Sequence, residues 1–140
     1  MRVVLVDDYA LVRSSIRKEL QAAGIEVVGE AADGEEALSL VERLRPDVLV
    51  LDVEMPKLNG VEVARRLQKR GGPRSSFPRI LVLSAYNNEG YMRGLLDAGA
   101  TGYVLKDEAL ETIVLAVQAA AHGLPWFSPS VMLKCASGIG

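Results

Sequence analysis

The run Val48-Leu49-Val50-Leu51, followed by Asp52, decides the fold class of this chain. A continuous apolar stretch of this length is typical of a parallel β-strand that is covered on both faces. A second stretch of the same kind, Val3-Val4-Leu5-Val6, is followed by Asp7 and Asp8. In open α/β sheets the ligand crevice lies outside the carboxyl ends of the strands. We therefore expect these acidic side chains to meet at one crevice, where a cation would offset their repulsion.

Strand-like and helix-like segments alternate five times around these two runs. This alternation predicts right-handed βαβ crossovers and a doubly wound, five-stranded parallel sheet of the α/β class. The predicted strands are 2–6, 25–29, 47–51, 79–83 and 101–105, and the predicted helices are 9–22, 35–44, 58–70, 88–98 and 108–121. The polar segment 71–78, rich in Gly, Pro and Ser, is expected to be a mobile loop.

Length and composition limit the class of protein. The chain has 140 residues, the size of one domain, and its 16 basic and 18 acidic residues give no sign of a nucleic-acid surface. The single cysteine, Cys135, excludes an internal disulfide and fits a reducing compartment. No apolar run approaches the roughly 18 residues of a membrane span, and a strand begins at Arg2 where a signal peptide would lie. We expect a cytoplasmic domain with no membrane partner.

Two more polar residues come directly after predicted strands. Ser84 comes after Ile80-Leu81-Val82-Leu83, and Lys106 comes after Tyr103-Val104-Leu105. Carboxylates with backbone carbonyls suit an octahedral Mg²⁺ that keeps waters and adds a phosphate. An ammonium and a hydroxyl nearby are donors for phosphoryl oxygens. The set therefore suits transfer of a phosphoryl group onto a carboxylate nucleophile.

In these positions the chain resembles the receiver domain of bacterial two-component response regulators. The resemblance covers Met1 to about His122. Further agreement comes from Met55-Pro56, Gly60, Ala85 and Tyr103. The stretch 98–107, with Gly123 and Ser128-Pro129 beyond it, looks most like the NarL/FixJ subfamily, also called the LuxR type. The resemblance implies a flavodoxin-like or CheY-like (βα)5 fold with strand order 2-1-3-4-5.

The resemblance also implies roles for the strand-end residues. Asp52 would accept a phosphoryl group from a phosphohistidine of a sensor histidine kinase. Asp8, Asp52 and the backbone carbonyl of Glu54 would bind Mg²⁺, and Asp7 would act through water. Lys106 would pair with a carboxylate at rest and with the phosphoryl group afterwards.

Four residues would govern the response to phosphorylation. Ser84 would move to hydrogen-bond a phosphoryl oxygen, and Tyr103 would turn inward into the space left behind. Glu54 and Tyr86 would flank the path of the attacking water and set the lifetime of the phosphoryl group. Replacing either of these two is expected to change that lifetime without abolishing phosphorylation.

The end of the chain suggests a boundary. We expect a receiver domain over 1–122, and a linker with the start of a sixth helix, 129–134, over 123–140. In the NarL/FixJ subfamily a helix-turn-helix DNA-binding domain normally comes next, and none is present here. Either the chain is truncated or the protein works as a single-domain receiver. DNA would be bound only through the missing output domain, and a homodimer on phosphorylation is a further expectation.

Two residues near the ends of the last predicted helix, Asp107 and His122, allow further expectations. His122 is the single histidine of the chain and is placed at the end of that helix, far from the strand ends, so the donor histidine must come from a partner. Asp107 follows Lys106 where many receivers have proline. A cis bond without proline costs about 3 kcal/mol, so the trans form is expected there. Asp107 would instead be the N-cap of the helix that starts at Glu108.

Other functions stay open at this point. A haloacid-dehalogenase-type phosphatase also uses a strand-end Asp and Mg²⁺, and Glu54 imitates its second acid, but that class usually has its nucleophile on the first strand. A phosphorylation-independent binding module would be expected to have lost its pocket residues. A flavin carrier of the flavodoxin type fits poorly, because the acidic turn at Asp7-Asp8 would repel a phosphate. We expect a receiver that catalyses its own phosphorylation but is not a turnover enzyme.

Overall fold

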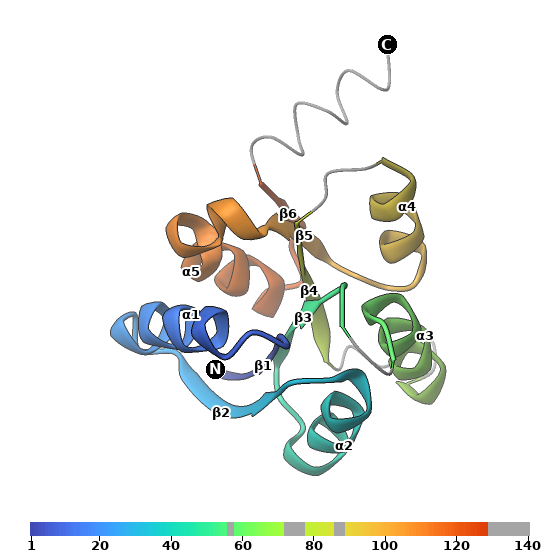
Figure 1. Cartoon of the computed structure of the whole chain (residues 1–140), viewed down its shortest axis with the longest axis horizontal. Coiled ribbons are helices and arrows are strands. Elements are labelled where there is room, and N and C mark those ends of the chain that lie inside the picture. Colours follow the sequence, from blue (N-terminus) through green and yellow to red (C-terminus); the bar gives the residue numbers. More distant parts are fainter. Residues whose placement is uncertain (56–57, 72–77, 86–88, 129–140) are drawn as a thin grey trace.

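A parallel sheet of six strands runs through the centre of the computed structural model, between two layers of helices (Figure 1). The structure describes residues 1–55, 58–71, 78–85 and 89–128. The strand order is β2-β1-β3-β4-β5-β6. The strands are β1 (Arg2–Val6), β2 (Glu26–Ala31), β3 (Val48–Asp52), β4 (Arg79–Ser84), β5 (Gly102–Leu105) and β6 (Trp126–Phe127).

The helices divide between the two faces of the sheet. Helices α1 (Ala10–Ala22) and α5 (Ala109–Ala121) cover one face, and α2 (Gly34–Leu44), α3 (Gly60–Gly71) and α4 (Glu89–Asp97) cover the other (Figure 1). A 3₁₀ turn, η1 (Lys106–Glu108), joins β5 to α5. None of the helices in the described ranges has the length and apolar character that a membrane span requires.

The position of β3 at the centre of the sheet explains its continuous apolar run. All of its residues are buried, because side chains of a strand alternate between the faces and both faces are covered. Leu49 and Leu51 belong to the core under α2, α3 and α4, whereas Val48 and Val50 belong to the core under α1 and α5. The strand therefore holds Asp52 rigidly at its carboxyl end.

The predicted elements are confirmed, each to within two residues at either end, and so is the strand order 2-1-3-4-5. The sequence did not predict β6, which pairs with β5 through Gly102 opposite Trp126 and Tyr103 opposite Phe127. Two residues are too few to show a strand period, so only the tertiary contact reveals this strand.

The next residue, Ser128, prolongs this contact. It is fully buried, its N–H donates to the Tyr103 carbonyl oxygen at 3.0 Å, and its Oγ accepts the Leu105 N–H at 2.9 Å. The segment 126–128 is thus bonded to the sheet along most of β5.

The expectation that Asp107 is the N-cap of the last helix is wrong. Asp107 lies inside η1, and Glu108 stands at the N-cap of α5 without a side-chain capping bond. The reason is that β5 runs straight into a 3₁₀ turn, which moves the start of α5 by one residue. His122 is at the end of α5 as predicted, with Nδ1 2.8 Å from the Gln118 carbonyl oxygen. The predicted helix 129–134 and most of the predicted loop 71–78, namely 72–77, lie outside the described residues.

Candidate functional site

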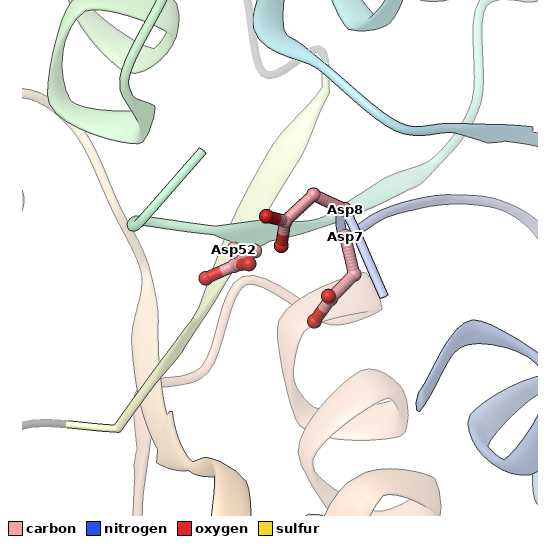
Figure 2. A group of neighbouring side chains, drawn as sticks. All are labelled: Asp7, Asp8 and Asp52. Atoms are coloured by element: carbon pink, nitrogen blue, oxygen red, sulfur yellow. The ribbon is translucent and has the colours of Figure 1, made fainter. Parts of the chain in front are cut away.

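Three acidic side chains meet at the carboxyl ends of β1 and β3, as the sequence predicted. One carboxylate oxygen from each of Asp7, Asp8 and Asp52 lies within 4.8 Å of the other two. Figure 2 shows Asp8 reaching from the end of β1 toward Asp52 on β3. Asp7 and Asp52 are buried, and Asp8 is exposed to solvent.

Backbone groups fix the two buried acids. The Asp7 N–H donates to the Ala31 carbonyl oxygen at 3.1 Å, and its Oδ1 accepts the Tyr9 N–H at 2.9 Å. Asp52 Oδ1 accepts the Glu54 N–H at 3.1 Å. Each carboxylate therefore keeps its second oxygen, Oδ2, for other partners.

Lys106 turns toward both of these second oxygens. Its Nζ lies 2.9 Å from Asp52 Oδ2 and 3.3 Å from Asp7 Oδ2, and 5.6 Å from the centre of the Tyr9 ring. Burial raises the pKa of Asp52 to about 7, and the hydrogen bond from Lys106 opposes this rise. For Lys106, burial lowers the pKa, but the hydrogen bond and charge of Asp52 outweigh it and the pKa is raised overall. Lys106 is thus a fixed cation beside a carboxyl group that titrates near neutral pH.

Glu54 makes a contact that could not be predicted from the sequence. Its Oε2 accepts the Ser84 hydroxyl at 3.2 Å, and its Oε1 accepts the Ala85 N–H at 3.1 Å. The resemblance implies that the Ser84 hydroxyl donates a hydrogen bond to a phosphoryl oxygen after phosphorylation. No sequence period relates Glu54 to Ser84, since the two residues are 30 positions apart and meet only because β3 and β4 are neighbours.

Comparison with known protein families fits this geometry. The family model of the response regulator receiver domain matches residues 3–118, most of the chain. The chain belongs to this receiver domain family.

Relatives of this receiver domain include transcription regulators of known name. It is 37% identical over 134 residues to the transcriptional regulatory protein DegU of Brevibacillus brevis, covering 94% of this chain and 54% of that protein. It is 35% identical over 127 residues to the DNA-binding transcriptional activator EvgA of Escherichia coli K12, covering 91% of this chain and 60% of that protein. The chain therefore spans between about half and three fifths of the length of these two relatives.

Solved structures agree with the fold. A LuxR-family two-component response regulator from Aurantimonas superposes with a TM-score of 0.90 at 32% identity, covering 98% of this chain and 96% of that one. The non-phosphorylated receiver domain of the stress response regulator RcsB from Escherichia coli gives 0.80 at 30% identity, covering 91% and 98%. The homologues are regulators of the LuxR/NarL type, as the resemblance suggested.

The acidic cluster of this receiver domain has the donor set of a hard divalent cation. Asp7 Oδ2 is buried and accepts no hydrogen bond of good geometry from any described residue, although the Lys106 ammonium lies 3.3 Å away. A buried carboxylate oxygen without a directed donor is costly unless positive charge is near. Three carboxylates against the single ammonium of Lys106 leave negative charge at the site, so the residues present fit a bound metal ion.

Gly60, another position of the resemblance, has a steric explanation. A Cβ atom there would lie 2.8 Å from Val53 Cα and 2.9 Å from the Asp52 carbonyl oxygen. The Gly60 N–H also donates to the Val53 carbonyl oxygen at 3.1 Å. Only glycine lets the start of α3 pack directly on the backbone of the phosphoacceptor candidate.

Two tyrosines have predicted roles, Tyr103 in the switch and Tyr86 in setting the lifetime of the phosphoryl group. Tyr103 is fully buried in the core under α2, α3 and α4, and its proposed motion stays a prediction. Tyr86 lies outside the described residues.

Proposed function

We propose that this receiver domain accepts a phosphoryl group on Asp52 from the phosphohistidine of a sensor histidine kinase. The observation that carries the proposal is the convergence on Asp52 of Lys106, at 2.9 Å, and of the acidic cluster with Asp7 and Asp8. In the transfer, an oxygen of the Asp52 carboxylate attacks phosphorus, the O–P bond forms, and the N–P bond breaks with its electron pair returning to the imidazole. The product is an acyl phosphate on the protein.

The residues around Asp52 would perform different parts of this transfer. Asp8, Asp52 and the Glu54 carbonyl oxygen would hold Mg²⁺, with Asp7 acting through water. When bound, Mg²⁺ supplies positive charge that offsets the phosphoryl oxygens. Lys106 would neutralise further charge and would need no large movement, because its ammonium already lies 2.9 Å from Oδ2 of Asp52, the carboxylate that would be modified.

The switch would begin with a competition for hydrogen-bond donors. A phosphoryl group on Asp52 adds a nearly dianionic group with three strong acceptors. Ser84 would leave the Glu54 carboxylate and bind one of these oxygens. Tyr103 would respond in the packing behind Ser84, as packed cores prefer discrete arrangements to gradual deformation.

The output would be transcription. The relatives DegU and EvgA are named as transcription regulators and extend well beyond the part that this chain matches. We propose that this receiver acts through a helix-turn-helix output domain, which alone would contact DNA, with a homodimer forming on phosphorylation. We place the protein in the cytoplasm, as a receiver that phosphorylates and dephosphorylates itself but does not turn over an external substrate.

A single-domain receiver acting by protein contact is the second candidate. In either case residues 1–122 would form the receiver and 123–140 the linker, whose first part, β6 (Trp126–Phe127), pairs with the sheet of the receiver. The phosphatase alternative is disfavoured, because Asp52 lies on β3 and not on the first strand.

Mass spectrometry after incubation with Mg²⁺ and acetyl phosphate tests the proposal. The wild type should gain one phosphoryl mass, and Asp52→Ala should gain none. Asp97→Ala is the matched control, since Asp97 is an exposed carboxylate at the end of α4 and should leave the modification intact. A phosphoryl group on the Asp52→Ala protein, or none on the wild type with either acetyl phosphate or a phosphorylated kinase, would contradict the proposal.

A further inference from the structure

Arg13 on α1 contacts the backbone of the acidic cluster. Its Nη1 donates to the Asp7 carbonyl oxygen at 2.5 Å, and its side chain is only 19% exposed. That carbonyl belongs to the peptide bond between Asp7 and Asp8. The bond from Arg13 therefore fixes the plane of the peptide group from which Asp8 departs.

Arg13 is itself held from the neighbouring strand. Its Nε lies 3.4 Å from Glu30 Oε1 on β2, and the other oxygen of Glu30 pairs with Arg17. The residue after Glu30 is Ala31, whose carbonyl oxygen accepts the Asp7 N–H. The end of β2 thus holds Asp7 on both sides, directly at the N–H and through Arg13 at the carbonyl.

Asp8 depends on this backbone more than the other two acids do. Within the part of the chain that the structure describes, the Asp8 carboxylate makes no hydrogen bond or ion pair, and the side chain is exposed. Asp7 and Asp52, in contrast, are buried and each accepts a backbone N–H. The direction of Asp8 toward the metal position is therefore set by the peptide plane behind it.

From this geometry we propose that Arg13, anchored by Glu30, is a positioning residue for the divalent cation: it orients the Asp7–Asp8 peptide so that Asp8 points at the ion. The inference rests on the proposed function, since it assigns a support to the same metal site. Groups that orient metal ligands typically change metal affinity about 10- to 100-fold when they are removed.

The chain supplies a matched control. Arg17 lies one turn further along α1 and pairs with the same Glu30, but among the described residues it makes no hydrogen bond or ion pair with Asp7. Arg13→Met and Arg17→Met each remove one positive charge and one ion pair from the same face of α1. Only the first removes the bond to the Asp7 carbonyl.

Isothermal titration of Mg²⁺ into the full chain separates the two variants. Arg13→Met should raise the Mg²⁺ dissociation constant by about tenfold, and Arg17→Met should stay within twofold of the wild type. The thermal unfolding midpoints of the two metal-free variants should be similar. Equal Mg²⁺ dissociation constants for Arg13→Met and Arg17→Met would overturn the inference.

Phosphorylation by acetyl phosphate gives an independent readout. In Arg13→Met the Mg²⁺ concentration for half-maximal rate should rise, while the rate at saturating Mg²⁺ should approach that of the wild type. A lower maximal rate with an unchanged Mg²⁺ requirement would contradict a positioning role. If Arg13→Met does not fold, Arg13→Lys takes its place. The lysine keeps one donor to the Asp7 carbonyl oxygen, so Mg²⁺ affinity should be largely retained. A loss of Mg²⁺ affinity as large as that of Asp8→Asn would overturn the inference.

The two proposals can fail separately. A wild type that binds no Mg²⁺, or an Asp8→Asn variant that binds it normally, removes the metal site itself. Only the role of Arg13 is removed if the wild type binds Mg²⁺, Asp8→Asn does not bind it, and Arg13→Met binds it with the affinity of the wild type.

Discussion

Glu54 Oε2 and Ser84 Oγ lie 3.2 Å apart, in a hydrogen bond that joins the ends of β3 and β4 beside Asp52. The other oxygen of the same carboxylate accepts the Ala85 N–H at 3.1 Å. The Glu54 carboxylate thus already accepts hydrogen bonds from two donors at the carboxyl end of β4, the Ser84 hydroxyl and the Ala85 N–H. In the switch that we propose, a phosphoryl group on Asp52 would compete with this carboxylate for the Ser84 hydroxyl.

The first prediction concerns this competition. Glu54→Gln and Glu54→Ala should accept a phosphoryl group from acetyl phosphate roughly 3- to 10-fold faster, because the anionic donor meets one carboxylate fewer beside the cluster of Asp7, Asp8 and Asp52. The lifetime of the phosphoryl group should change as well, without loss of phosphorylation. Phosphate-affinity gels over time measure both rates.

Glu62→Gln is the control for net charge in this experiment. Glu62 is on α3, partly exposed and paired with Arg66, so its loss removes the same charge without removing the contact between Glu54 and Ser84. Rates and lifetimes in Glu54→Ala equal to those of Glu62→Gln would show that the Glu54 contact has no kinetic role.

The second prediction is a pH dependence of stability. Burial raises the pKa of Asp52 to about 7 from the usual 3.8, so the folded protein binds this proton more tightly than the unfolded chain does. As pH rises from about 4 to about 7, the unfolded chain loses the proton first, and the free energy of unfolding falls through this window. Above pH 7 the effect is constant.

Asp52→Asn removes the titrating group and should reverse this loss. In metal-free buffer at pH 8 the variant should be more stable than the wild type by at least about 1 kcal/mol, or roughly 4 °C in Tm. The advantage should shrink between pH 7 and pH 4, and Mg²⁺ should stabilise the wild type more than the variant. Thermal unfolding of both proteins between pH 4 and pH 8 measures the difference in stability. A difference in Tm that does not vary with pH would contradict the raised pKa of Asp52.

The third prediction tests the contact of Ser128 with β5. Ser128→Ala leaves the buried Leu105 N–H without its acceptor, which should lower the free energy of unfolding by about 1–3 kcal/mol. Ser39→Ala on α2 is the control, because Ser39 is exposed and its loss should cost less than about 0.5 kcal/mol. Urea unfolding of both variants gives the comparison. Equal stabilities would mean that the bond at Ser128 contributes nothing.

The fourth prediction pairs two glycines with opposite outcomes. A Cβ at Gly94 on α4 would meet nothing within 4 Å, so Gly94→Ala should stabilise the domain by about 0.5–1 kcal/mol. A Cβ at Gly102 would lie 2.7 Å from the Trp126 carbonyl oxygen and 2.8 Å from Leu81 Cδ1. Gly102→Ala should therefore destabilise the domain by about 1–3 kcal/mol.

The tryptophan makes this pair easy to follow. Trp126 is the single tryptophan of the chain and lies in β6, so its emission should shift to the red in Gly102→Ala and stay unchanged in Gly94→Ala. An unshifted emission in Gly102→Ala would show that β6 tolerates the added methyl group.

The central strands and the strand-end residues could be predicted from the sequence because their signals are local. An apolar run covered on both faces, such as 48–51, is legible without a structure, and parallel strands bring their carboxyl ends to one edge. The sequence therefore predicted that Asp7, Asp8, Asp52, Ser84 and Lys106 lie at the carboxyl edge of the sheet, where the structure has them. Their chemical roles, and the trans form of the peptide bond between Lys106 and Asp107, stay predictions.

Contacts between elements without a local signal could not be predicted. Glu54 finds Ser84 only through the pairing of β3 with β4, and Arg13 finds the Asp7 carbonyl only after α1 has packed beside β2. Asp107 has the residue type of an N-cap, but the 3₁₀ turn after β5 takes the position instead. The capping preference of a residue type is a weak guide to where a helix begins when the chain passes directly from a strand into a turn.

The pairing of 126–128 with β5 has a practical consequence for excising this module. A protein cut after His122 would expose the backbone N–H and C=O groups of β5 as an uncovered sheet edge, a surface that recruits strands from other molecules. Such a fragment should form aggregates or strand-exchanged dimers that do not depend on phosphate. Studies of self-association should therefore retain the chain through Ser128, so that an artificial edge is not mistaken for a signalling interface.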